Sequence, residues 1–189
     1  MADENALIER SRRKDTRAFE QLVALKRAKA VRVAWNIVGD LDDAREVAQL
    51  AFIKLWSVID RFDVEAPFDP WFSRIVVNLA IDHCRKRLRI ARKEEGAPGR
   101  LPSQVMPGAD AELMRAELRR ILDELSSELG PIQRAVFTLK EIEGESTETI
   151  ATILDIKAST VRNHLMQARR TIRDGLESRY PEYFRRSRR

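Results

Sequence analysis

The 189-residue sequence lacks the features of a disulfide-bonded or membrane-spanning protein. Its only cysteine, Cys84, excludes an internal disulfide bond and suits a reducing compartment. No run approaches the roughly 20 consecutive apolar residues that a membrane-spanning helix needs. The first residues also contain no apolar segment typical of a signal peptide. We therefore expect a soluble, cytoplasmic protein with no membrane insertion.

Glycine and proline are scarce, with seven of each, and they divide the chain where they gather. Residues 94–109 contain three of each, so this segment cannot continue a helix. Elsewhere valine and isoleucine recur at helical rather than alternating spacing. The sequence thus predicts an all-α protein with two small helical domains at residues 1–93 and 110–178. We expect a flexible linker at residues 94–109 and a basic tail at residues 179–189, of which the last six residues, FRRSRR, should be mobile.

Charged residues, by contrast, are abundant and make up 34% of the sequence. The 35 lysines and arginines outnumber 30 acids, and the net charge of +5 fits a polyanionic partner such as nucleic acid. Because so many acids remain, we expect acids and bases to be distributed unevenly over the surface, with different faces binding different partners.

Three helices are predicted in the first domain. One covers residues 16–38 and ends before Gly39, and Asp42 or Asp43 caps a second helix. A third begins near Trp71, which we expect in the core. This helix ends in six bases within nine residues: Arg85, Lys86, Arg87, Arg89, Arg92 and Lys93. Bases at a helix C-terminus suit the helix dipole, but six exceed what the dipole needs, so the cluster favours phosphate contact.

The most informative segment, residues 144–172, ends the second domain. Ser146 is placed to cap a short helix, and residues 155–157 form a tight turn before a second helix. Each helix has a single apolar face, formed by Ile150, Ala151 and Leu154 in the first and by Val161, Leu165, Ala168 and Ile172 in the second. This pattern indicates a helix-turn-helix, whose second helix enters the major groove of DNA.

The outer face of that second helix carries side chains that bind base edges or phosphates: Thr160, Arg162, Asn163, His164, Gln167, Arg169 and Arg170. An ordinary amphipathic helix pair with a solvated surface is the alternative. Such a surface usually interleaves acids with its bases, whereas no acid occurs between Lys157 and Arg173. The composition of this face therefore favours DNA recognition.

Five segments, in order and at the right spacing, resemble the extracytoplasmic-function (ECF) sigma factors, the small two-domain members of the bacterial sigma-70 family. They are AFEQLV (18–23), DDAREVAQLAFIKLW (42–56), FDPWFSRIVVNLAIDHCRKR (68–87), IQRAVFTLKEIEGES (132–146) and the helix-turn-helix. The resemblance implies an RNA polymerase sigma factor that directs promoter-specific initiation and is not an enzyme. The first domain resembles region 2, which binds the polymerase clamp and melts the −10 element. The second resembles region 4, which binds the flap and reads the −35 element.

The resemblance also implies which residues form each surface. Those expected at the −35 element are the outer-face residues of the recognition helix given above. Those expected at the −10 element are Phe62, Arg74, Asn78, Arg85, Lys86 and Arg87. Those expected to bind core polymerase are Asp43, Glu46, Gln49, Leu50 and Ile53. Two alternatives stay open: Phe62 could instead anchor its loop on the domain core, and Asp43 and Glu46 could belong to a solvated acidic face.

Four positions depart from the family pattern. Leu50 stands where relatives commonly have an acid, which would replace a charged polymerase contact by an apolar one. Asn163 and His164 stand where relatives often have Ser-Arg, and Gln167 where they have a base. Since Asn and Gln pair with adenine, we expect a −35 sequence different from that of well-known relatives.

The expected partners are core RNA polymerase (clamp and flap), promoter DNA and an anti-sigma factor. No cofactor is expected, and no metal, because His83 and His164 are isolated.

A conventional helix-turn-helix regulator that does not engage core polymerase is the alternative function, although such a protein needs a sensing domain that the helical first half does not resemble. A DNA-processing enzyme is disfavoured because no carboxylate triad is evident. Redox sensing by Cys84 would require the thiol to be exposed.

Overall fold

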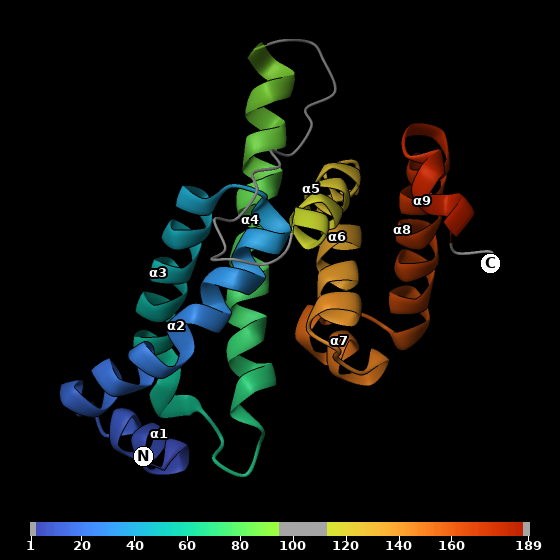
Figure 1. Cartoon of the computed structure of the whole chain (residues 1–189). Helices are drawn as coiled ribbons and strands as arrows, with labels where there is room; N and C mark the ends of the chain where they lie inside the picture. The colour runs from blue at the N-terminus through green and yellow to red at the C-terminus, as the bar shows by residue number, and fades with distance from the viewer. Residues whose placement is uncertain (1–2, 95–112, 187–189) are drawn as a thin grey trace.

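The computed structural model describes residues 3–94 and 113–186, which form helices joined by short turns, with no strand among them (Figure 1). The N-terminal half contains α1 (Glu4–Arg12), α2 (Thr16–Val38), α3 (Leu41–Val58), the 3₁₀ turn η1 (Ile59–Arg61) and α4 (Phe68–Glu94). The C-terminal half contains α5 (Leu113–Ser126), α6 (Pro131–Phe137), the π-helical turn η2 (Thr138–Ile142), α7 (Thr147–Leu154), α8 (Ala158–Arg179) and α9 (Pro181–Arg186). The predicted all-α fold is confirmed, and most of the predicted linker lies outside the described residues.

Local signals explain how α2 ends and α3 begins. Gly39 adopts a left-handed conformation with φ 80°, and its N–H donates to the Trp35 carbonyl at 2.8 Å, which closes the last turn of α2. Asp40 follows at once, and its side chain accepts hydrogen bonds from the N–H groups of Asp42 and Asp43. The prediction that Asp42 or Asp43 caps α3 was therefore wrong by two or three residues, because both lie inside its first turn.

The two halves share one apolar core. The buried cluster begins with residues of α1 to α4 and continues into Ala135, Val136, Leu139, Ile150 and Ile153 of the C-terminal half. In Figure 1, α6 and α7 lie alongside α4, and α4 contacts both of them. The C-terminal part of α2, from Val33 to Val38, is buried on every side because η2 and α6 cover the face that α3 and α4 leave open.

Two terminal segments differ from the predictions. The helix α1 was not expected, because its mean polarity is high, yet it buries Leu7 and Ile8 against the N-terminal core. The predicted basic tail starts at Arg179, but α8 extends to that residue and α9 follows it. Arg179 pairs with Glu124 and Glu128 of the C-terminal half, and the Tyr180 hydroxyl donates to Glu124 at 2.6 Å. These charge-assisted contacts hold the end of α8 against α5.

The core predicts the effect of one substitution in α3. Leu55 is fully buried, so Leu55→Ala removes apolar contacts and leaves a cavity. We expect the free energy of unfolding to fall by about 2–5 kcal/mol, measured by urea denaturation followed by circular dichroism. The neighbouring Lys54→Ala, at an exposed position, should change it by less than about 0.5 kcal/mol. Equal effects of the two substitutions would contradict the assigned core.

Candidate nucleic-acid interface

The predicted helix-turn-helix is formed by α7 and α8. The Ser146 side chain caps α7 by accepting from the Thr149 N–H at 2.9 Å, as the sequence predicted. The turn is closed by Asp155 in the left-handed conformation, with φ 56°, which Asp tolerates better than most residues. Ile156 packs on the core and joins the two helices. The inner face of α8 is formed by Val161, Leu165 and Ala168, all buried.

The outer face of α8 is accessible to a large ligand. Thr160 and His164 are half-buried, and the other predicted residues are exposed, namely Arg162, Asn163, Gln167, Arg169 and Arg170. Met166, which sequence reasoning passed over as apolar, lies among them with 64% of its surface exposed. This flexible apolar side chain is therefore available for a contact outside the chain.

Three of these residues have partners within the C-terminal half, and one of them, Arg170, pairs with Asp174 of its own helix at 3.7 Å. Arg169 donates to the Glu141 carboxylate of η2 at 2.7 and 3.1 Å. The Gln167 Oε1 accepts from the Gln133 side chain at 2.8 Å. The sequence has no acid between Lys157 and Arg173. The acid that pairs with Arg169 is Glu141, which belongs to η2 and not to α8. Arg162, Asn163 and Met166 therefore form the most available part of the outer face.

A second polar surface runs along α4. Asn78, Arg85 and Lys86 are exposed, in agreement with a surface role. Arg74 and Arg87 are half-buried and paired: the Arg74 Nη2 lies 3.1 Å from the Asp155 Oδ2, and Arg87 pairs with Asp43. The Arg85 Nη1 also lies 3.4 Å from the Asp82 Oδ1. Among the described residues, the fold thus leaves Asn78 and Lys86 without an ion pair and holds Arg74, Arg85 and Arg87 in ion pairs.

Phe62 differs from the other predicted −10 residues because it is only 3% exposed. Its ring packs edge-on against Phe68 at 5.3 Å between centroids and lies 4.8 Å from Trp71. This is the loop-anchor arrangement that the sequence left open, and a base can stack on the ring only if the cluster opens. Trp71 packs on the core as expected.

The predicted polymerase-binding residues lie along α3. Glu46, Gln49, Leu50 and Ile53 are exposed, the last two at 44% and 59%. Asp43 instead points toward α4, where its carboxylate pairs with Arg87 and lies 3.1 Å from the His83 Nε2. Between α2 and α3 runs an apolar groove of about 660 Å³, lined by Phe19, Val23, Phe52, Ile53 and Trp56, with Gln49 and Arg45 at its rim.

Cys84 is fully buried, and its thiol faces the Ile37 carbonyl with the sulfur at 3.5 Å. Burial raises the pKa of the thiol to about 11, although Arg134 and Arg87 lie near enough to oppose the shift. The exposure that redox sensing requires is therefore absent.

Within residues 3–94 and 113–186, no group of three or more acids, histidines or cysteines is placed to hold a metal ion, and no helix is long and apolar enough to cross a membrane.

Sequence reasoning missed the polar contacts between the two halves. Arg32 of α2 forms a bidentate pair with Glu143, and Arg134 of α6 is buried with its Nε donating to the Asn36 carbonyl at 2.8 Å. Each looked like an ordinary surface residue, because nothing in a helical pattern reveals that another segment will cover it.

Comparisons with known protein families give one match in each half of the chain. The Sigma-70 region 2 family matches residues 22–90, and the Sigma-70 region 4 family matches residues 119–172. The chain is 31% identical to RNA polymerase sigma-H factor of Pseudomonas aeruginosa over 178 residues, which cover 90% of this chain and 92% of that one. It is 28% identical to ECF RNA polymerase sigma factor SigW of Bacillus subtilis, over 89% of this chain and 94% of that one.

Solved structures of similar fold include two complexes. CnrH bound to the cytosolic domain of CnrY matches with a TM-score of 0.65 and 24% identity, over 94% of this chain and 99% of that chain. The sigma factor RpoE bound to the anti-sigma factor NepR from Bartonella quintana matches with a TM-score of 0.68 and 22% identity, over 84% and 96%. The chain therefore belongs to the sigma-70 family of RNA polymerase sigma factors, and its relatives place it among the ECF members.

The buried thiol predicts a chemical result. Native protein at pH 7 should react with iodoacetamide at least about a hundredfold more slowly than the same protein in urea, because the thiol is both protonated and enclosed. Mass spectrometry of the alkylated protein measures the rate. Cys84→Ser should also leave the response to oxidant unchanged. Rapid native labelling, or a Cys84-dependent oxidant response, would restore the redox hypothesis.

Proposed function

We propose that this sigma factor binds core RNA polymerase through α3, reads the −35 element with α8 and opens the −10 element with the surface of α4. The chain acts as a DNA-reading subunit of the polymerase in the cytoplasm, and the chemistry of RNA synthesis belongs to the core enzyme. What carries the proposal is the outer face of α8, where Arg162 and Asn163 are exposed and no acid occurs between Lys157 and Arg173.

At the −35 element, the recognition surface is centred on Arg162, Asn163 and Met166. Arginine pairs with guanine through two hydrogen bonds, asparagine pairs with adenine, and an apolar side chain contacts the thymine methyl group. Gln167 adds adenine preference once it leaves Gln133. Thr160, His164, Arg169 and Arg170 bind the phosphate backbone around these contacts and fix the register of the helix.

At the −10 element, Asn78 supplies the polar edge contact to a base, and Arg85 and Lys86 hold the backbone of the opened strand. Arg74 and Arg87 join them after leaving their present acids. Phe62 supports the loop before α4 through its contact with Phe68 and Trp71, so its contribution to the site is chiefly to shape that loop.

Core polymerase binds the face of α3 formed by Glu46, Gln49, Leu50 and Ile53. The apolar groove beside this face suits an amphipathic partner helix, because its floor is aromatic and aliphatic and its rim is polar. Asp43 acts from the edge by holding Arg87. The similar fold of the sigma factor RpoE, solved in complex with the anti-sigma factor NepR, supports an anti-sigma factor as a further partner of this chain.

Run-off transcription tests the proposal. Purified core RNA polymerase is given a library of random upstream sequences, with and without this protein. We expect initiation only when the protein is present, at sequences enriched in two motifs separated by a constant spacing. DNA binding without core, and no new transcripts, would favour the conventional helix-turn-helix regulator.

Two substitutions separate the two motifs. Arg162→Ala should relax preference at one −35 position by about 5–150-fold, the equivalent of the 1–3 kcal/mol carried by a bidentate base contact, and leave the −10 motif intact. Asn78→Ala should do the reverse. Both effects are read from the enriched sequences in the same transcription assay. Arg173→Ala and Gln21→Ala, at exposed positions outside both surfaces, serve as matched controls. A uniform loss of transcription at unchanged motifs would contradict the base-reading roles.

A further inference from the structure

The loop between η1 and α4 (residues 62–67, the −10 loop) is held at its two ends. Phe62 at its start and Phe68 just after it are both buried, and their rings meet edge-on at 5.3 Å between centroids. The residues between them are exposed. The Asp63 side chain accepts from the Glu65 N–H at 3.1 Å, which bonds the loop to itself. The position of the −10 loop therefore depends on what holds the aromatic pair and the first turn of α4.

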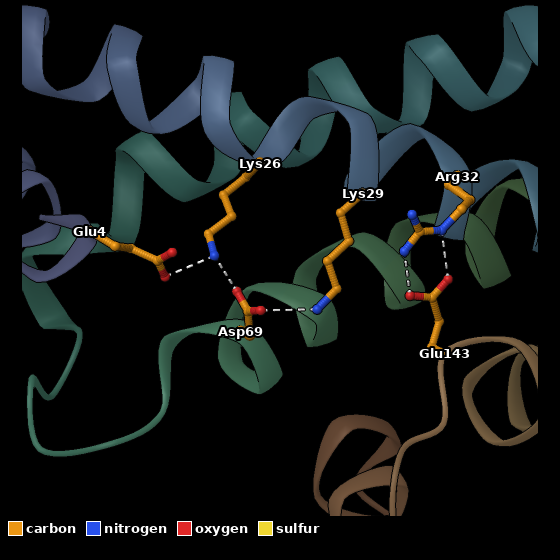
Figure 2. Close-up of polar contacts among 6 residues, drawn as sticks. All are labelled: Glu4, Lys26, Lys29, Arg32, Asp69 and Glu143. Carbon is orange, nitrogen blue, oxygen red and sulfur yellow. Dashed lines mark hydrogen bonds and ion pairs between the residues drawn. The ribbon is translucent and has the colours of Figure 1, made fainter. Parts of the chain in front are cut away.

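A buried lysine of α2 contacts the end of the −10 loop. Lys26 is 8% exposed, and its ammonium lies 2.6 Å from the carboxylate of Asp69, in the first turn of α4 (Figure 2). The same ammonium lies 5.8 Å from the centroid of the Phe68 ring. Lys29 binds the other carboxylate oxygen of Asp69 at 3.0 Å. Burial opposes the charge of Lys26, yet hydrogen bonds to Asp69 and Glu4 raise its pKa above the ordinary value, so it stays charged.

The helix α1 contacts the same lysine from the opposite side. In Figure 2, Lys26 reaches from α2 into the space between Asp69 and Glu4, the first residue of α1. The Glu4 carboxylate lies 2.8 Å from the Lys26 ammonium. Leu7 and Ile8 are buried and fix α1 on the core. A helix that packs through its own apolar residues thus presents an acid to the lysine that holds the end of the −10 loop.

The turn after α1 reaches the chain on the other side of the loop. Lys14 has a left-handed backbone, with φ 63°, which is uncommon for residues other than glycine. Its ammonium donates to the Trp56 carbonyl at 2.7 Å and lies 3.5 Å from the Asp60 carboxylate in η1, just before Phe62. One short N-terminal segment is therefore linked to the chain at both ends of the −10 loop.

We propose that α1, Lys14 and Lys26 form a brace that fixes the −10 loop before DNA arrives, so that both lysines are positioning residues for promoter opening. This inference rests on the proposed function of the surface of α4 at the −10 element. Ordering a loop costs conformational entropy, so a loop that is already ordered in the free protein captures an opened strand at lower cost. The two lysines act through Asp60 and Asp69 and need no contact with DNA.

Lys26→Met removes the charge at the centre of the brace and preserves the fold. Methionine is flexible and has nearly the same length, and it is surrounded by apolar side chains such as Ala30 and Val33. The Glu4 and Asp69 side chains are 39% and 41% exposed, so water hydrates them once the ammonium is gone. The melting temperature measured by circular dichroism should therefore stay within about 4 °C of the wild-type value.

Run-off transcription by the holoenzyme on two templates tests the positioning role. On a duplex promoter, Lys26→Met should lower transcription about tenfold, because only molecules whose loop is in place capture the opened strand. Lys14→Met, at an exposed position, tests the other arm of the brace and should lower it about threefold. On the same promoter with a mismatched, unpaired −10 element, both variants should come within about twofold of wild type. Arg17→Met, which removes a charge from an exposed position of α2, is the matched control on both templates.

A nitroxide spin label on the −10 loop measures its order directly. The label is attached at Ala66→Cys, an exposed position, in a Cys84→Ser background. In the free protein, Lys26→Met should shorten the rotational correlation time of the label about threefold, and Arg17→Met should leave it unchanged.

Equal losses of transcription on the duplex and mismatched templates would overturn the inference. Unchanged duplex transcription in both lysine variants, or an unchanged label spectrum in Lys26→Met, would overturn it as well. Failure of the proposed function has a different signature, because the wild-type protein would then direct no transcription with core polymerase from either template.

Discussion

The helix α4 is the element on which both halves of the molecule depend. One side of it packs against α2 and α3, and another packs against α6 and α7. Fully buried residues such as Val77, Ala80 and Cys84 hold the interior of this arrangement. At the same time α4 exposes Asn78, Arg85 and Lys86. A single helix of 27 residues therefore serves as core, as domain contact and as candidate DNA surface.

This triple use explains the pattern of charges around α4. Arginines that would be free on a solvated helix, such as Arg74 and Arg87, are matched by acids from other elements. Such pairs contribute little to stability when they are exposed, because water competes for both partners. Their value lies in specificity, because they set which faces of α4 meet α3 and the turn after α7.

The sequence predicted the helices and their ends better than it predicted contacts between residues that lie far apart along the chain. The helix over residues 16–38, the start of α6 at Pro131 and the two helices of the helix-turn-helix all follow from capping residues and apolar spacing, which are local. The pairs Arg32–Glu143 and Arg74–Asp155 could not be predicted, because they join residues 111 and 81 positions apart. The burial of Phe62 also depends on Phe68 and Trp71, which only the folded loop brings together.

The central claim is that this chain, as a subunit of RNA polymerase, opens promoter DNA. Permanganate, which oxidises unpaired thymines, tests it directly on a promoter selected with this sigma factor. We expect reactive thymines around the −10 element when core polymerase and this protein are both present, and none with either alone. Strand opening by core alone, or stable binding of the complete mixture without any reactive thymine, would contradict it.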